Sequence, residues 1–134
     1  MTTVFTKILQ GELPGRFVYR DDICAAFLTI APICPGHTLV VPVAEVDHWV
    51  DLDDDTAAHL MVVAKRVAAA QQRAFNPTRI SLIIAGLEVP HTHLHVLPIH
   101  RESDIDFSKA KADTPPEELD AVAEQLRAEL DRDV

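Results

Sequence analysis

The sequence is poor in cysteine and in basic side chains, and each shortage excludes a class of protein. Cys24 and Cys34 are the only cysteines and do not form a Cys-x-x-Cys pair, which predicts two reduced thiols rather than a disulfide framework. Lysine and arginine together number 12 against 21 aspartates and glutamates, a net charge of −9. Because phosphate neutralisation supplies most affinity for nucleic-acid polymers, this acidic chain without a basic stripe is not expected to bind them.

Long apolar runs and internal repeats are also missing. No stretch approaches the roughly 20 apolar residues of a membrane span, and residues 1–10 lack the apolar segment of a signal peptide. We therefore expect a cytoplasmic protein without membrane attachment. The 134 residues, 48% hydrophobic and 25% charged, are typical of one soluble domain over residues 1–134. Residues 101–134 hold 11 acidic and 5 basic side chains, so −6 of the net charge lies there.

Apolar periodicity and turn residues predict an α+β protein. The predicted strands cover residues 16–20, 24–30, 38–41, 80–85 and 90–98. The predicted helices are a short one at 4–10, a long one at 53–75 and a C-terminal one that follows a capping box at 114–117 and ends near 130. The long helix has one apolar face, formed by Leu60, Val63, Val67 and Ala70. Short connections favour an antiparallel sheet with helices on one face, which leaves the other face polar, functional or covered by a partner.

Three histidines alternate with other residues in the stretch 90–98. Side chains along a strand point to opposite faces in turn, so His91, His93 and His95 are expected to share one face of a strand. The alternate residues would then face the core: Thr92, Leu94 and Val96. We expect the strand to begin at Pro90 and to end at Pro98, because proline cannot donate to the ladder.

A fourth histidine directly follows a predicted tight turn. Pro35 and Gly36 fit the second and third positions of a type II turn, where glycine tolerates a positive φ. His37 would then lie at the start of strand 38–41. His59, inside the long helix, is expected to face solvent or to make a contact on the helix surface.

The four histidines allow three interpretations from spacing alone. A neutral imidazole is a competent nucleophile, so one ring could attack phosphorus while its neighbours and His37 donate hydrogen bonds to phosphoryl oxygens. Three histidines with a water could instead form a zinc hydrolase site. The third interpretation is a polar sheet face, for example at a subunit interface.

Three separated segments resemble the histidine triad (HIT) family of nucleotide hydrolases and transferases. They are 91–97 (HTHLHVL), 35–42 (PGHTLVVP) and 5–14 (FTKILQGELP), in the family's order. The resemblance implies a five-stranded antiparallel sheet with a long central helix and a C-terminal helix, paired into one continuous sheet in a homodimer. It also implies cleavage at the α-phosphate of a nucleoside phosphoramidate or dinucleoside polyphosphate, through a nucleotidyl-histidine intermediate and without a cofactor.

The resemblance also assigns roles to individual residues. It implies that His93 is the nucleophile, that His95 and His37 line the phosphate, and that His91 completes the network that orients His93. It places a purine nucleotide or nucleotide conjugate against six residues: Phe27, Leu28, Thr29, Ile30, Glu88 and Val89. No metal ligand is expected.

The sequence departs from the family pattern at several positions. Thr29 stands near the family's acidic ribose-binding residue, Leu87 replaces a common glutamine, and Glu88 falls where a serine is frequent. The connection from Ile84 to His91 also lacks the usual asparagine-glycine loop. The Cys-x-x-Cys zinc site of some bacterial relatives reads Thr-Val-Phe-Thr at 3–6, so no zinc is expected there or at His48. Two rivals stay open: a non-catalytic nucleotide-binding module and a histidine-ligated metal hydrolase.

Overall fold

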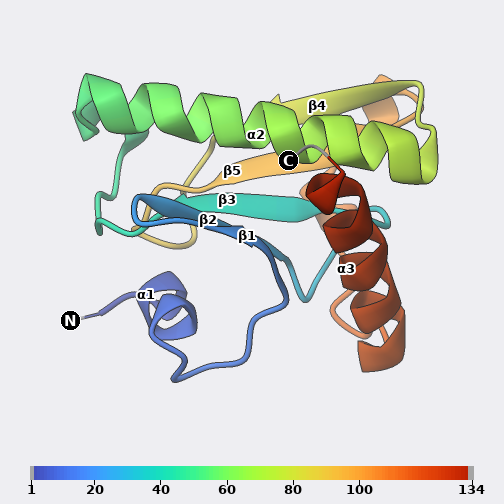
Figure 1. Cartoon of the computed structure of the whole chain (residues 1–134), viewed down its shortest axis with the longest axis horizontal. Helices are drawn as coiled ribbons and strands as arrows, with labels where there is room; N and C mark the ends of the chain where they lie inside the picture. The colour runs from blue at the N-terminus through green and yellow to red at the C-terminus, as the bar shows by residue number, and fades with distance from the viewer. Residues whose placement is uncertain (1, 133–134) are drawn as a thin grey trace.

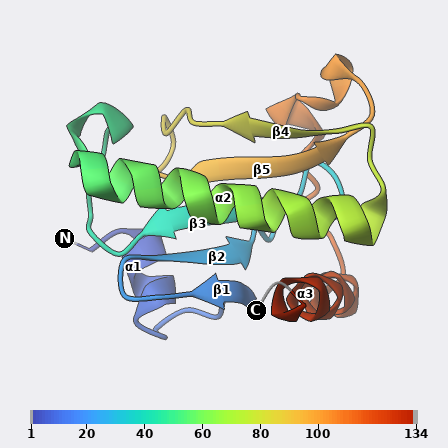
Figure 2. The same ribbon diagram turned by 45° about the horizontal axis from the view of Figure 1, so that its top comes forward.

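The computed structural model describes residues 2–132, which fold as an α+β protein around one antiparallel sheet (Figure 1). The strands are β1 (Phe17–Arg20), β2 (Cys24–Leu28), β3 (Thr38–Pro42), β4 (Arg79–Ile83) and β5 (Leu94–Ile99). The helices are α1 (Val4–Leu9), α2 (Asp54–Phe75) and α3 (Pro116–Asp131), with 3₁₀ turns at η1 (Trp49–Asp51), η2 (Glu102–Asp104) and η3 (Phe107–Lys109). The strand order β1-β2-β3-β5-β4 is antiparallel throughout and confirms the predicted class (Figure 2).

The long helix α2 packs along one face of the sheet, as its periodicity predicted. The four residues of its predicted apolar face are all buried, and they pack with α3 against β2, β3 and β5. Asp53 caps the first turn by accepting a hydrogen bond from Thr56 N–H, and Asn76 ends the helix with φ of 48°. Within residues 2–132, no helix has the length and apolar content needed to cross a membrane.

The opposite face of the sheet is partly covered by α1, so the prediction of helices on one face was wrong. Phe5 and Leu9 of this helix pack against β2 and β3 residues that point away from α2, among them Phe27 and Leu39. Figure 1 shows α1 and α2 on opposite sides of the sheet. A helix of six residues carries too little periodicity to reveal which face it covers.

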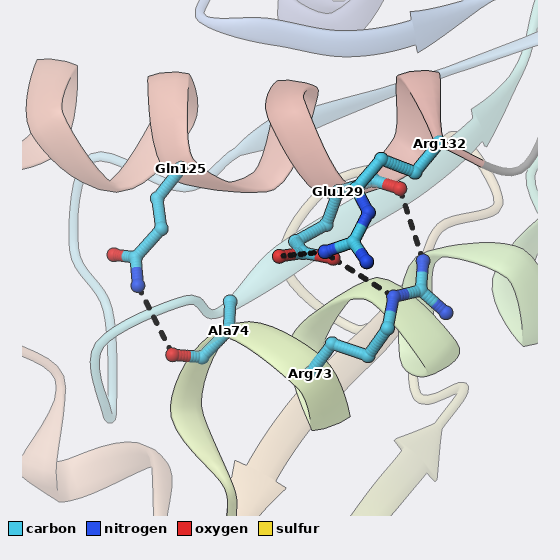
Figure 3. Close-up of polar contacts among 5 residues, drawn as sticks. All are labelled: Arg73, Ala74, Gln125, Glu129 and Arg132. Atoms are coloured by element: carbon cyan, nitrogen blue, oxygen red, sulfur yellow. Dashed lines mark hydrogen bonds and ion pairs between the residues drawn. The ribbon is translucent and has the colours of Figure 1, made fainter.

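The C-terminal helix α3 is anchored to the end of α2 by polar contacts (Figure 3). Arg73 donates to a carboxylate oxygen and to the main-chain oxygen of Glu129, and Gln125 donates to the carbonyl of Ala74. The predicted capping box at 114–117 was wrong. Pro115 is the N-cap, without a side-chain cap, and the Thr114 hydroxyl instead donates to the carbonyl of Lys111.

The histidine stretch does not form the continuous strand that was predicted. β5 begins at Leu94, so only His95 of the three histidines lies in the ladder. The preceding residues are held by a loop instead, because Thr92 donates both its N–H and its hydroxyl to the carbonyl of Val46. That contact is long-range, and the alternation of residue types gave no indication of it.

Pro98 does not end β5, contrary to the prediction. The strand continues to Ile99, and Pro98 pairs with Ile80 of β4. The β3–β5 pairing ends at Val96, which faces Thr38. Beyond that pair, one side of β5 has no strand to which a backbone N–H would donate, so proline is tolerated there.

Candidate functional site

An open pocket of about 680 Å³ lies on the α1 side of the sheet. The wall from α1 includes Phe5, the floor includes Leu39 of β3, and His93 and His95 reach it from the start of β5. All six residues that the family resemblance placed at the nucleotide also line this pocket. The structure therefore brings together two segments, 27–30 and 88–89, that are far apart in the sequence. His37 and His91 lie behind the pocket wall, each in contact with a histidine that lines it.

Main-chain contacts fix the tautomer of His93. Its Nδ1 lies 2.7 Å from the carbonyl oxygen of His91. A carbonyl oxygen can only accept, so Nδ1 carries the proton and the neutral ring keeps its lone pair on Nε2. His93 is 6% exposed, so the rotamer of the ring is confined by its surroundings. The arrangement is that of a preoriented nitrogen nucleophile.

A second chain of hydrogen bonds fixes the tautomers of His37 and His95. The N–H of Ile33 donates to His37 Nδ1 at 3.1 Å, so the proton of a neutral His37 lies on Nε2. Nε2 is 2.9 Å from His95 Nδ1 and donates to it. His95 must then carry its own proton on Nε2. The Nε2–H of His95 is thus a hydrogen-bond donor beside His93. The ring centres of these two histidines are 4.9 Å apart.

The tight turn before His37 is tied to both central strands by one buried side chain. Gly36 has φ of 94°, and the N–H of His37 donates to Cys34 O at 3.1 Å, which confirms the predicted turn. Gln71 of α2 donates through Nε2 to the carbonyls of Gly36 and Val96, at 2.8 and 2.9 Å. These two carbonyls neighbour His37 and His95 in the chain, so Gln71 fixes the spacing between those histidines.

Burial keeps three of the histidines neutral. It lowers the pKa of His37 to about 3 and that of His95 to about 4, and a neighbouring histidine adds to each effect. Burial also lowers the pKa of His91, although its contact with Pro42 opposes the change. Neutral rings can donate and accept in the fixed directions described above, whereas a protonated ring would break the chain of hydrogen bonds.

The protein is expected to lose stability as the pH falls from about 6.5 toward 4. Unfolded histidines titrate near 6.5, whereas folded His37 and His95 titrate near 3 and 4, so the unfolded chain binds more protons in this window. Each of the two can lower the free energy of unfolding by up to about 1.4 kcal/mol per pH unit. Urea unfolding at pH 7.5, 6 and 5 measures the slope. His37→Gln should reduce it and the exposed control His100→Gln should not; equal slopes in all three proteins would contradict the assignment.

Six aromatic rings form a row, and five of them line the pocket. Successive ring centres are 4.9 to 5.8 Å apart along a row of six side chains. In order they are Phe17, Phe27, Phe5, His93, His95 and Phe107. Phe107 was missed from the sequence because it lies in a polar stretch without periodicity. Its ring is 46% exposed and meets that of His95 edge-on, which leaves it free to contact a bound molecule.

Few charges face the pocket. Among its lining residues only Arg16 and Glu88 are charged, and the guanidinium of Arg16 already binds Asp120 at 2.7 Å. Glu88 is exposed, and Leu87 beside it is 95% exposed. Thr29 accepts a hydrogen bond from Ala31 N–H and offers no carboxylate to a ribose. The pocket therefore suits a mostly apolar molecule with a small anionic group.

The histidine rings do not fit a metal hydrolase. Such a site needs three protein ligands on one ion, but both nitrogens of His37 and of His91 are engaged within the protein. In the part of the chain described, a different group could hold a metal: Asp21, Cys24 and His59 have ligand atoms within 4.8 Å of one another. Asp21 there accepts from His59 at 2.6 Å, the surface contact expected of this histidine, and also from Tyr19 and two main-chain N–H groups.

Comparison with known proteins gives consistent matches. Residues 10–102 match the family model of the HIT domain. An uncharacterized HIT-like protein of Borreliella burgdorferi is 34% identical over 113 residues, 79% of this chain and 81% of that protein. The adenosine 5'-monophosphoramidase of Schizosaccharomyces pombe is 27% identical over 136 residues, 97% and 99% of the two chains. The crystal structure of a hypothetical histidine triad nucleotide-binding protein from Sulfolobus tokodaii superposes with a TM-score of 0.84 at 28% identity, covering 96% and 91%.

Proposed function

Because this chain belongs to the HIT domain family, we propose that it is a nucleotidyl hydrolase that cleaves nucleotide conjugates at the α-phosphate. The observation that carries the proposal is the tautomer of His93. Its Nδ1–H is held by the carbonyl of His91, so the Nε2 lone pair remains on a ring that lines the pocket. A nucleophile with this orientation, beside the Nε2–H of His95, has the geometry that phosphoryl transfer needs.

The reaction proceeds in two displacements. His93 Nε2 forms a bond to the α-phosphorus as the bond to the leaving group breaks, and the leaving atom takes up a proton from solvent in the open pocket. The positive charge that develops on the ring is stabilised by the Nδ1–H bond to His91, while His95 Nε2–H donates to a phosphoryl oxygen. Water then attacks phosphorus and loses a proton, the nitrogen–phosphorus bond breaks, and neutral His93 and a nucleoside monophosphate remain.

The pocket favours a nucleoside phosphoramidate over a dinucleoside polyphosphate. A polyphosphate leaving group brings additional negative charges, which need cations for compensation. The pocket offers only Arg16, which is paired with Asp120, and it adds the carboxylate of Glu88. An amine leaving group carries no such charge. We place the base, a purine by resemblance, against Phe27, Leu28, Thr29 and Ile30.

The experiment that tests the function is early quenching of a reaction with adenosine 5'-phosphoramidate. Mass spectrometry of the quenched protein should find an adenylyl group on His93, and turnover should release AMP. Diadenosine polyphosphates should be cleaved more slowly. Tight binding of AMP with neither adduct nor turnover would instead establish the rival, a non-catalytic nucleotide-binding module, which the carboxylate of Glu88 in the pocket lining favours.

We also propose that two copies pair through β4 into one continuous sheet. This strand ends the sheet order and has no partner on its outer side among residues 2–132. On β4, Leu82 pairs with Val96 of β5 and is 38% exposed. The apolar side chains of Met61 and Val62 on α2 are exposed as well. Sedimentation equilibrium should give twice the chain mass of 14.8 kDa. Leu82→Lys should shift the measured mass toward that of the monomer, and a monomeric parent protein would contradict the pairing.

A cytoplasmic location stays a prediction.

A further inference from the structure

The side chain of Thr3 contacts His91 from a distant part of the sequence. Its hydroxyl oxygen lies 2.7 Å from His91 Nδ1, across 88 positions of sequence. His91 Nε2 is 2.7 Å from the carbonyl oxygen of Pro42, so the ring proton lies on Nε2 and Nδ1 can only accept. Thr3 must therefore donate. Its oxygen in turn accepts from the N–H of Thr6, as the N-cap of α1.

The main chain of Thr3 also makes a hydrogen bond that fixes its position. Its N–H donates to Glu45 Oε1 at 2.8 Å. The side chain of Thr6 also bonds to Glu45, and these two hydrogen bonds lower the pKa of this carboxyl group, which therefore stays ionised. A carboxylate in the loop after β3 thus fixes the residues at the start of α1. The same loop holds the histidine stretch, through Thr92 and Val46.

The ring of His91 is thereby clamped from two sides and fully buried. Thr3 holds Nδ1 and Pro42 holds Nε2. The carbonyl of this same residue accepts the Nδ1–H of His93. Phe5, two residues after Thr3, meets both imidazoles, with ring centres 5.8 Å from His91 and 4.9 Å from His93. The start of α1 therefore touches His91 and His93 and also forms part of the pocket wall.

We propose that Thr3 is a positioning residue for the nucleophile, acting through His91 on the orientation of His93. The carbonyl of Pro42 places the proton of His91 on Nε2, and the hydroxyl of Thr3, which donates to Nδ1, fixes where the ring lies. The ring in turn fixes the carbonyl that holds the proton on His93 Nδ1. The proposal rests on the proposed hydrolase function for its consequence in rate, but the tautomers can be measured without turnover.

Three substitutions separate the contact with His91 from the helix cap. Thr3→Ser keeps both hydrogen bonds, Thr3→Val removes both, and Thr3→Asp keeps a cap for α1 but offers no proton to His91. We expect Thr3→Val and Thr3→Asp to lower kcat about 10- to 100-fold, the usual effect of losing a group that orients a reacting side chain, with KM changed less than about threefold. Thr3→Ser should stay within about threefold of the parent. Thr114→Val, which removes a hydroxyl outside the pocket, is the matched control.

Two readouts distinguish positioning from general destabilisation. Nitrogen-15 NMR of the histidine rings should show His91 as the Nε2–H tautomer and His93 as the Nδ1–H tautomer in the parent and in Thr3→Ser. Thr3→Val should shift both signals. In Thr3→Asp, the carboxylate and Pro42 compete for one ring proton, so kcat relative to the parent should recover as the pH falls and His91 gains its second proton.

The outcomes are decisive in either direction. Unchanged ring nitrogen signals of His91 and His93 in Thr3→Val would overturn the proposal, even in a protein that turned over no substrate. Full activity in Thr3→Asp together with loss in Thr3→Val would also overturn it, because the helix cap alone would then explain the effect. Absence of turnover in the parent, with the expected shifts of the ring nitrogen signals, would contradict the hydrolase function but not the contact between Thr3 and His91.

Discussion

His93→Ala is expected to abolish hydrolysis while leaving nucleotide affinity within about threefold of the parent. The substitution removes the only atom that bonds to phosphorus, and loss of a covalent nucleophile usually costs at least about 10⁴-fold in kcat. The pocket walls do not depend on this ring, because Phe27, Leu39 and α1 pack on one another. Steady-state hydrolysis of adenosine 5'-phosphoramidate and calorimetric titration with AMP measure the two quantities.

A matched control directly follows Ile99, the last residue of β5. His100→Ala makes the same chemical deletion at an exposed histidine whose Nδ1 lies 3.2 Å from the Thr78 hydroxyl. It should leave both rate and affinity unchanged. If His93→Ala kept more than about a tenth of the parent rate, another group would have to be the nucleophile.

Gly36→Ala is expected to lower the free energy of unfolding by about 3 kcal/mol, the largest stability effect foreseen here. Gly36 has φ of 94°, which a residue with a Cβ adopts only with strain. An added Cβ would also lie 2.6 Å from Cε2 of Phe75, the last residue of α2. The turn cannot move away easily, because Gln71 holds the carbonyl of Gly36 at 2.8 Å. Any movement of the turn that relieves the overlap would displace His37, so the rate of hydrolysis should fall as well.

Gly11→Ala separates the two causes of this loss. Gly11 has φ of 83°, but nothing lies within 4 Å of an added Cβ, so only the backbone strain of about 1 kcal/mol applies. In the double variant Gly36→Ala/Phe75→Leu, the overlap is relieved, and the cost should be less than the sum of the single changes. Urea unfolding of the parent, of the single variants Gly11→Ala, Gly36→Ala and Phe75→Leu, and of the double variant measures these costs. An equal cost at the two glycines would mean that Phe75 moves aside freely.

The regular elements were predictable because their signals are local. The repeated spacing of Leu60, Val63 and Val67 defines the core face of α2 without any knowledge of its partners. The errors lie where a distant contact decides the conformation. The alternation at 91–95 was consistent with a strand, yet Val46 draws Thr92 out of the ladder. Thr114 had the sequence context of a cap, but its hydroxyl bonds Lys111.

In the candidate site, too, features with a sequence signal were predictable, and features set by distant contacts were not. Most residues placed by the family motif line one pocket, with His37 and His91 behind its wall, because the motif records which segments converge. The contributions of Thr3 and Phe107 could not be foreseen, since each depends on closure of a chain segment over the pocket. The direction of every histidine hydrogen bond was also hidden, because main-chain groups such as Ile33 N–H and His91 C=O set the tautomers.

The long-range pairs of the pocket have a consequence for the order of folding. His37 and His95 are 58 positions apart, and Thr3 and His91 are 88 apart, so these contacts form only after large loops close. The β1–β2 hairpin and α2 depend mainly on near neighbours and can form earlier. Refolding chains should therefore regain their far-ultraviolet helical signal before they regain nucleotide binding, and partly folded chains should be unable to consume nucleotides.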